Sequence, residues 1–304
     1  MRVVSLLPSA TEILYALGVE PVAVSHECDF PPAAREKPAA NRSRIDPEVA
    51  SREINEQVAS AESGEGVYQL REDVLRDADP DLIVTQGVCD VCAVDDGLVR
   101  AAVNDLGLDA EILTTHPHSL DDVLDDVRRI GERTGRRERA VELSEELTAR
   151  IRSVRERAPP DGRRVLVADW MEPVMVAGHW VPGVVETAGG TYGMADPGDR
   201  SRPRRFEEVL AYDPEVLIAA PCGFTLDRML EHVGELTDRD GFEQLTAARE
   251  GAVYAVDGHH YVNRPGPRLV DTLEHVAGIL HPETFGTPPR DVVRRVGTRD
   301  AKVE

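Results

Sequence analysis

Long apolar runs and lysine are scarce in this sequence, and no leader segment is recognisable. None of the 304 residues lies in a run approaching the roughly 18 apolar residues that indicate a membrane-spanning helix. The opening residues, MRVVSLLPSATE, lack the charged, apolar and cleavage regions of a signal peptide. We therefore expect a cytoplasmic protein if Met1 is the native start, and an extracytoplasmic protein if a signal segment was removed.

Basic residues are also few relative to acidic residues. Lysine occurs only at positions 37 and 302, and 35 Lys and Arg face 56 Asp and Glu, which gives a net charge of −21. This charge excludes nucleic acid as a partner, because its binding depends on cationic contacts. An acidic excess with little lysine resembles the proteins of salt-loving archaea, so we expect a halophilic protein with a solvated carboxylate coat.

An internal repeat predicts two α/β lobes. Residues 74–84 read VLRDADPDLIV and residues 209–219 read VLAYDPEVLIA, and each contains a helix end, Asp-Pro with an acid, and a short apolar strand. Pro80 and Pro214 stop the helix and permit the turn. A second, weaker similarity relates two further segments. A strand at 3–7 and its helix ending at 16–18 correspond to a strand at 165–168 and a segment ending at 187–190. Alternating strands and helices in both halves predict an α/β fold.

Further apolar runs at 21–25, 112–114, 174–177 and 252–256 predict buried parallel strands. Between the halves, two stripes of apolar residues at helical spacing predict two linking helices, the second about 20 residues long and so roughly 30 Å. The predicted domains are an N-terminal lobe at 1–118, linking helices at 119–158, a C-terminal lobe at 159–287 and a polar tail at 288–304.

Candidate ligand-binding residues follow the predicted strands, because open parallel sheets bind ligands outside the carboxyl ends of their strands. Ser9 and Glu12 form a predicted capping box at such a helix start. Soft and aromatic side chains gathered at one end of both sheets indicate a small-molecule cleft between the lobes. The predicted ligand-binding residues are Ser9, His26, Cys28, Gln86, Cys89, Trp170, Trp180, Cys222, Phe224, His260, Tyr261 and Arg264.

The four cysteines leave several interpretations open. They line the cleft or pack beside it, they are buried and inert, or Cys28, Cys89, Cys92 and Cys222 hold a metal ion. Cys89 and Cys92 also have the spacing of a redox pair or half of a zinc site. His259 and His260 form either a polar loop pair or a weak metal motif.

Enzymatic motifs are missing from the chain. It has no phosphate-binding loop, no glycine-rich dinucleotide motif after a strand, no GxSxG nucleophile turn and no HExxH zinc motif. We therefore predict a binding protein rather than an enzyme.

The segments RVVSLLPSATEILYALG near the start, PDLIVTQ at 80–86 and YVNRPGPRLV at 261–270, with the long linking helix, resemble a known family. It is the substrate-binding protein family of iron-siderophore, haem and cobalamin ABC importers, in its cobalamin-binding branch. The resemblance implies two Rossmann-like lobes with parallel sheets, a single long joining helix and a ligand between the lobes. It also implies docking on an ABC permease through the acids seven residues before the repeat prolines, Asp73 and Glu207.

The HECD segment at 26–29 and the CDVC segment at 89–92 look like a signal-less, cytoplasmic-type subgroup described as cobalamin-binding. The implied function is the binding of a corrinoid or a related metal chelate, linked to ABC-type uptake. The alternatives are a cytoplasmic Cys/His metalloprotein or enzyme on the same scaffold, and a CxxC redox protein. The oligomeric state and the identity of the ligand are not predicted.

Overall fold

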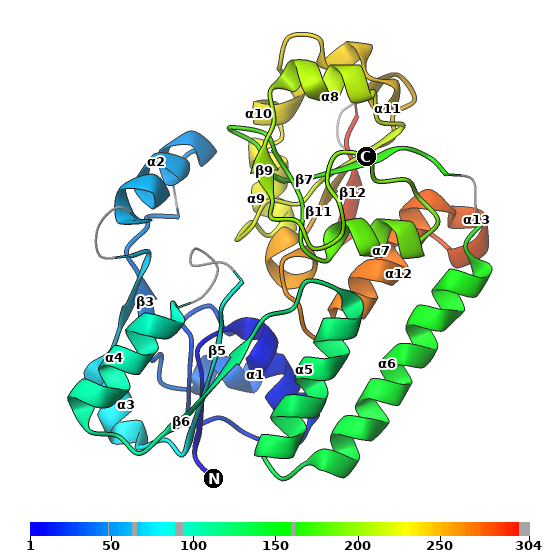
Figure 1. Ribbon diagram of the computed structural model, residues 1–304. Coiled ribbons are helices and arrows are strands. Elements are labelled where there is room, and N and C mark those ends of the chain that lie inside the picture. The colour runs from blue at the N-terminus through cyan, green and yellow to red at the C-terminus, as the bar shows by residue number, and fades with distance from the viewer. Residues whose placement is uncertain (48, 63–65, 89–93, 160–161, 298–304) are drawn as a thin grey trace. The chain divides into compact units, whose positions relative to one another are not determined.

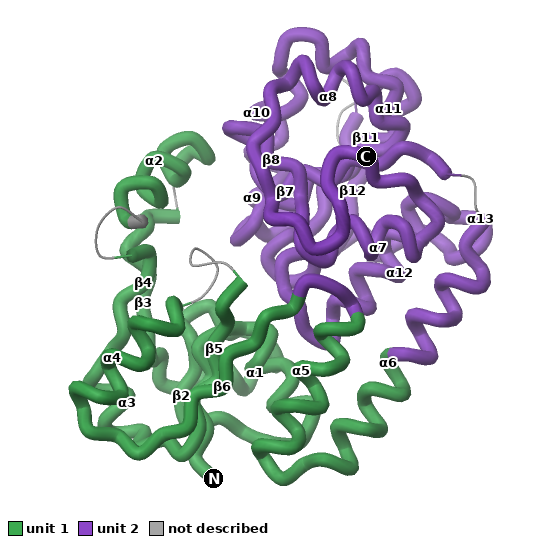
Figure 2. The backbone as a smooth tube through the Cα atoms, in the orientation of Figure 1, with its two compact units in different colours: residues 1–117, 121–147 green, residues 118–120, 148–304 purple. Residues whose placement is uncertain are grey.

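The computed structural model describes residues 1–47, 49–62, 66–88, 94–159 and 162–297 (Figure 1). The chain forms two compact units, which Figure 2 distinguishes by colour: unit 1 holds residues 1–117 and 121–147, and unit 2 holds residues 118–120 and 148–304. Each unit has its own sheet, so the predicted two-lobed α/β fold is confirmed. The predicted linking segment, 119–158, is not a separate body, because its residues are shared between the two units.

Unit 1 is built on a four-stranded parallel sheet in the order β2-β1-β5-β6. The strands are β1 Val3–Ser5, β2 Ala23–Val24, β5 Leu82–Gln86 and β6 Glu111–Thr115. A separate antiparallel pair consists of β3 Asn41–Ser43 and β4 Tyr68–Leu70. The helices of this unit are α1 Pro8–Ala16, α2 Ser51–Glu62, α3 Glu72–Ala78, α4 Asp96–Leu106 and α5 Leu120–Arg133, with a short 3₁₀ helix at Pro32–Glu36. β1 and β5 are buried throughout, as continuous apolar strands require.

Unit 2 has a six-stranded sheet in the order β12-β11-β10-β7-β8-β9. Its parallel centre is β7 Val165–Trp170, β10 Val216–Ala219 and β11 Val253–Val256, and its antiparallel strands are β8 Met175–Val176, β9 Arg202–Pro203 and β12 Val293–Arg295. Its helices include α7 Val181–Thr187, α8 Phe206–Tyr212, α9 Leu226–His232, α10 Gly234–Thr237, α11 Thr246–Arg249, α12 Leu269–Leu280 and α13 Pro282–Phe285, with a 3₁₀ helix at Phe242–Gln244.

Two expectations for unit 2 are wrong. The strand predicted at 174–177 is antiparallel, because only a short turn separates it from β7, and a parallel pairing needs a longer crossover. The polar tail predicted from 288 contains β12, which pairs with β11 and buries Val292 and Val293. The last described residues therefore belong to the sheet.

The internal repeat is confirmed in detail. Helices α3 and α8 end at Asp79 and Asp213, whose backbones take left-handed conformations with φ of 40° and 47°. In each case the amide N–H at the helix end bonds back to a carbonyl of the last turn, Leu75 or Val209, and a proline follows. Strands β5 and β10 begin two residues after that proline.

The long helix is also confirmed. It is α6, Arg137–Arg157, with 21 residues, and the unit boundary falls inside it. Its predicted stripe is buried, and the members of that stripe are Ala140, Leu143, Leu147, Ile151 and Val154. A Cβ on Gly131 of α5 would lie 2.3 Å from the Ala140 Cβ, so glycine lets α5 and α6 approach closely within unit 1. No helix among the described residues has the length and apolar character to cross a membrane.

Candidate functional site

The loops that follow β10 and β11 are locked together at the carboxyl edge of the unit 2 sheet. The amide of Asn263 donates to the carbonyls of Ala220, at 2.9 Å, and Gly258, at 3.2 Å. A Cβ at Gly258 would lie 2.3 Å from the carbonyl oxygen of Pro221, so only glycine fits here. Two loops from different strands therefore form one rigid platform.

The platform carries an aromatic pair. The rings of Trp170, at the end of β7, and Phe224 meet edge to face with centroids 5.5 Å apart. The Arg228 guanidinium lies 4.1 Å from the centre of the Phe224 ring. Phe224 is only 1% exposed and Trp170 is partly exposed. The predicted pair is thus brought together, with Trp170 as the accessible ring and Phe224 as its support.

A histidine and arginine cluster completes the platform. His260 donates its backbone N–H to Asp257, and its Nδ1 lies 2.7 Å from the same carboxylate. Burial would raise the pKa of Asp257, but the bonds from His260 outweigh it, so this pKa lies below its usual value. Arg264 is 3% exposed and lies 2.9 Å from Nε2 of His259. Because a guanidinium can only donate, Nε2 of His259 is the acceptor and its proton sits on Nδ1.

Asp169, at the same edge, is a residue that the sequence did not single out. Ser201 Oγ donates to its Oδ2, while Oδ1 is buried and has no hydrogen-bond partner among the described residues. Burial raises the pKa of Asp169 to about 7, against the opposing effect of the Ser201 bond. Its position at the carboxyl end of the apolar run 165–168 was the available signal.

The cysteines fall into three groups. Cys222 follows β10, is partly exposed, and donates its backbone N–H to the carbonyl of Asp169 at 3.1 Å. Cys28 is 4% exposed and its sulfur lies 3.0 Å from the Thr11 hydroxyl. Cys28 therefore packs inside unit 1, and its predicted contact with a ligand stays a prediction. Cys89 and Cys92 lie outside the described residues, so the cysteine metal site stays a prediction.

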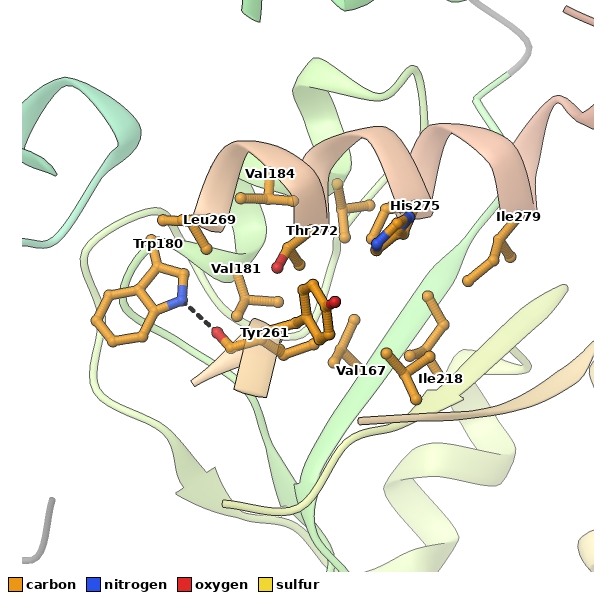
Figure 3. A pocket seen from close by; sticks show the side chains of 14 residues that line it. Val167, Trp180, Val181, Val184, Ile218, Tyr261, Leu269, Thr272, His275 and Ile279 are labelled. Carbon is orange, nitrogen blue, oxygen red and sulfur yellow. Dashed lines mark hydrogen bonds between the residues drawn. The ribbon is translucent and has the colours of Figure 1, made fainter. Parts of the chain in front are cut away.

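Trp180 is buried and Tyr261 is partly exposed. They line an apolar seam between α7, α12 and the sheet, with Trp180 only 7% exposed (Figure 3). The Trp180 indole N–H donates to the Val262 carbonyl at 2.8 Å, and the Tyr261 ring lies 5.4 Å from that of His275. The seam has about 10 Å³ of free space, room for at most one water, so no ligand enters the seam itself, and the ligand-binding roles of the two residues stay predictions.

Three predicted residues lie at the carboxyl ends of unit 1 strands. Ser9 is buried within the first turn of α1, which begins at Pro8 with Leu7 as its cap, so the predicted capping box is absent. Gln86 ends β5 and is 4% exposed. His26 is exposed, with both its backbone N–H and its Nδ1 near Oδ1 of Asn41. Burial lowers the pKa of His26, but the Glu27 carboxylate outweighs this, so the pKa is raised.

The two predicted docking acids occupy equivalent places in the repeat. Asp73 and Glu207 are exposed in the first turns of α3 and α8. The Arg71 guanidinium bonds to Asp73 at 3.0 Å and lowers the pKa of that carboxyl. The described residues offer Glu207 no ion-pair partner.

Two α/β units, one with a parallel sheet and one with a mixed sheet, share one long helix, which is the architecture of the two-lobed binding proteins. A family model described as periplasmic binding protein matches residues 3–259 of the chain. The chain therefore belongs to the periplasmic binding protein family, whose members are the substrate-binding proteins of ABC importers. The resemblance to this family, inferred from the sequence motifs, is confirmed, and its cobalamin-binding branch stays a prediction.

Several known proteins are similar along the chain. The vitamin B12-binding protein of Vibrio cholerae is 26% identical over 284 residues, covering 92% of this chain and 88% of that protein. The cobalamin-binding protein of Halobacterium salinarum is 28% identical over 173 residues, covering 55% of this chain and 46% of that protein. A solved periplasmic heme-binding protein from Pseudomonas aeruginosa superposes with a TM-score of 0.72 at 18% identity, covering 98% of both chains. The last comparison shows the fold alone.

Proposed function

We propose that this chain binds a corrinoid, cobalamin or its precursor cobinamide, for an ABC importer. The observation that carries the proposal is the similarity to a vitamin B12-binding protein along 92% of the chain. The Halobacterium salinarum relative named as cobalamin-binding supports the same ligand. Solved heme-binding proteins share the fold, so haem is the competitor that an experiment must separate.

The unit 2 platform supports a corrinoid chemically. A corrinoid is a large disc with apolar faces and amide side arms. The partly exposed Trp170 ring supplies an apolar surface, and Phe224 holds that ring from behind. The partly exposed His259 and His260 supply polar groups for amide arms at the rim of the platform, and the buried Arg264 holds the His259 ring in place.

The test is a titration of the purified protein with cyanocobalamin, cobinamide and haemin, followed by calorimetry and absorbance. We expect one corrinoid per chain, and Trp170→Ala to weaken its binding by about tenfold, which corresponds to about 1.4 kcal/mol. Phe285→Ala is the matched control, because Phe285 is an aromatic residue of α13 in the same unit and contacts Arg157 instead. If haemin binds saturably and neither corrinoid gives heat or a spectral change, the protein is a haem carrier and this proposal is wrong.

We also propose that the permease contacts are made by Asp73 and Glu207. Their exposed positions in equivalent first turns of α3 and α8 support this assignment, because a pair of matched docking points suits a two-lobed protein. The carboxylates would meet cationic side chains of the permease.

A further inference from the structure

Two histidine rings from distant parts of the sequence meet within unit 2. His118 lies in the short segment before α5 and belongs to unit 2, and His179 lies between β8 and α7. Their ring centroids are 5.8 Å apart and their planes are inclined by 33°. His118 also packs near Gly198, since a Cβ placed on that glycine would lie 3.9 Å from the His118 Cβ. None of the binding interpretations above uses this pair.

The backbone of His179 is held in an unusual conformation. Its φ is 53°, in the left-handed region that residues other than glycine rarely adopt. Its N–H donates to the Asp199 carbonyl at 2.5 Å, and its own carbonyl accepts from Gly198 at 2.9 Å. A Cβ on Gly178 would lie 2.2 Å from the same Asp199 oxygen, so the two loops are pressed together. A strained residue held this firmly calls for a functional explanation.

The imidazole of His179 is suited to a ligand role. Its Nδ1 is buried and makes no hydrogen bond within the part of the chain that the structure describes. Burial, with smaller effects from His118 and Arg200, lowers the pKa of His179 to about 4, so the ring is neutral at neutral pH. A neutral imidazole offers a lone pair to a metal ion without competition from a proton. The acidic residues Asp196 and Asp199 lie on the same loop as Arg200.

We propose that His118 and His179 together bind one divalent transition-metal ion, such as Zn²⁺, Ni²⁺ or Cu²⁺. Imidazole nitrogens bind such ions at about 2.0–2.1 Å, and the ring centre lies about 1.1 Å further out. Two imidazoles on one ion, at angles from tetrahedral to linear, then have centroids about 5 to 6.5 Å apart. The observed 5.8 Å lies in this range. Water completes the coordination.

Trp180 provides a direct readout, because its ring lies 5.6 Å from that of His179. The chain has only two tryptophans, so Trp170→Phe leaves Trp180 as the sole indole emitter. We expect Cu²⁺ added to this metal-free protein to quench the emission, to saturate at one equivalent and to be reversed by a chelator. Calorimetry with Zn²⁺ measures the same stoichiometry without quenching.

Single substitutions test the assignment. His179→Asn removes the imidazole but keeps a residue that tolerates the left-handed conformation, and His118→Asn removes the other ring. Each should weaken Zn²⁺ and Cu²⁺ binding by at least about tenfold while the melting temperature of the metal-free protein stays close to that of the parent. His232→Asn, in the same unit, is the matched control and should leave binding unchanged.

The proposal is overturned if folded His118→Asn and His179→Asn proteins bind either ion as tightly as the parent. It is also overturned if the quenching and the heat survive in both variants but disappear after alkylation of the thiols, because the ion would then be held by cysteine.

Discussion

At the residue scale, the carboxyl group of Asp169 links pH to the stability of unit 2. Burial raises its pKa to about 7, whereas an Asp in an unfolded chain titrates near about 3.9. At a pH between these two values, the Asp169 carboxyl is therefore protonated in the folded protein and ionised in the unfolded chain. The stability that depends on this proton is fully present below about pH 4 and is lost as the pH rises through about 7.

Replacing the Asp169 carboxyl with an amide should remove the loss of stability at high pH. Asp169→Asn keeps an oxygen that accepts from Ser201 and cannot ionise. We expect the variant to exceed the wild-type free energy of unfolding by roughly 2 to 4 kcal/mol at pH 8, with the difference shrinking toward pH 4. Urea unfolding at a series of pH values measures this.

Asp126→Asn is the matched control for this titration. Burial also raises the pKa of Asp126, to about 6, in spite of the neighbouring Arg129. Its effect should begin at the same pH but level off about one pH unit lower, which separates the two carboxyl groups. A difference between Asp169→Asn and wild type that is the same at every pH would show that Asp169 does not titrate between the folded and unfolded states.

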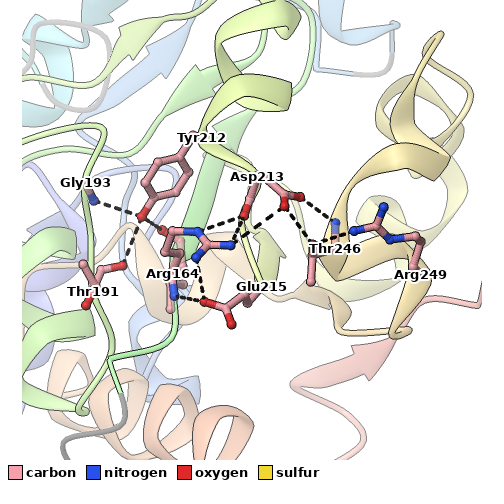
Figure 4. Close-up of polar contacts among 9 residues, drawn as sticks. Arg164, Thr191, Gly193, Tyr212, Asp213, Glu215, Thr246 and Arg249 are labelled. Atoms are coloured by element: carbon pink, nitrogen blue, oxygen red, sulfur yellow. Dashed lines mark hydrogen bonds and ion pairs between the residues drawn. The ribbon is translucent and has the colours of Figure 1, made fainter.

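At the scale of elements, the two turns of the repeat share a backbone shape but differ in their side-chain contacts. Asp79 and Asp213 both end a helix in the left-handed conformation. The Asp213 carboxylate accepts bonds from the N–H and hydroxyl of Thr246, at 2.7 and 2.8 Å, and so caps the start of α11 (Figure 4). These two bonds lower the pKa of Asp213. The carbonyl of Asp213 also accepts from Arg164.

Asp79 and Asp213 allow an experiment in which one residue is the control for the other. Asp213→Ala and Asp79→Ala impose the same left-handed strain on alanine, but only the first removes the cap on Thr246. We expect Asp213→Ala to lower the free energy of unfolding by about 1 to 2 kcal/mol more than Asp79→Ala does. Thermal or urea unfolding of the two variants measures the difference. Equal losses would mean that the Thr246 bonds contribute nothing to stability.

The sequence predicts the elements whose signals are local. The Asp-Pro turns, strands β5 and β10 and the stripe of α6 follow from proline geometry and helical spacing, which neighbouring residues determine. Strands β9 and β12 have two and three residues, too few for a periodic pattern, and they exist because a partner strand is beside them. The same limit applies at the candidate site. Position after a strand marks Trp170 and Arg264, but whether Trp180 faces solvent or core depends on packing against α12.

At the scale of the whole molecule, the two units have separate sheets and a common chemistry at their strand ends. Polar residues lie at or after the carboxyl ends of the strands in both units, including His26 and Gln86 in unit 1 and Asp169 and Arg264 in unit 2. The match of the family model across residues 3–259 shows that this order of elements is that of a binding protein, even where the identity to any one relative is low. Fold and family therefore follow from the whole chain, while the ligand depends on a few side chains.

The net charge of −21 should make the stability of the entire chain depend on salt. Carboxylates closer together than the Debye length repel each other in the folded state, and raising the salt from 0.1 to 1 M shortens this length from about 10 Å to about 3 Å. We expect the melting temperature to rise by several degrees over this range of KCl, measured by calorimetry. Sucrose at equal osmolality is the control, because it adds no screening. A melting temperature that rises equally in both, or not at all in KCl, would mean that screening of the carboxylate repulsion does not stabilise the chain.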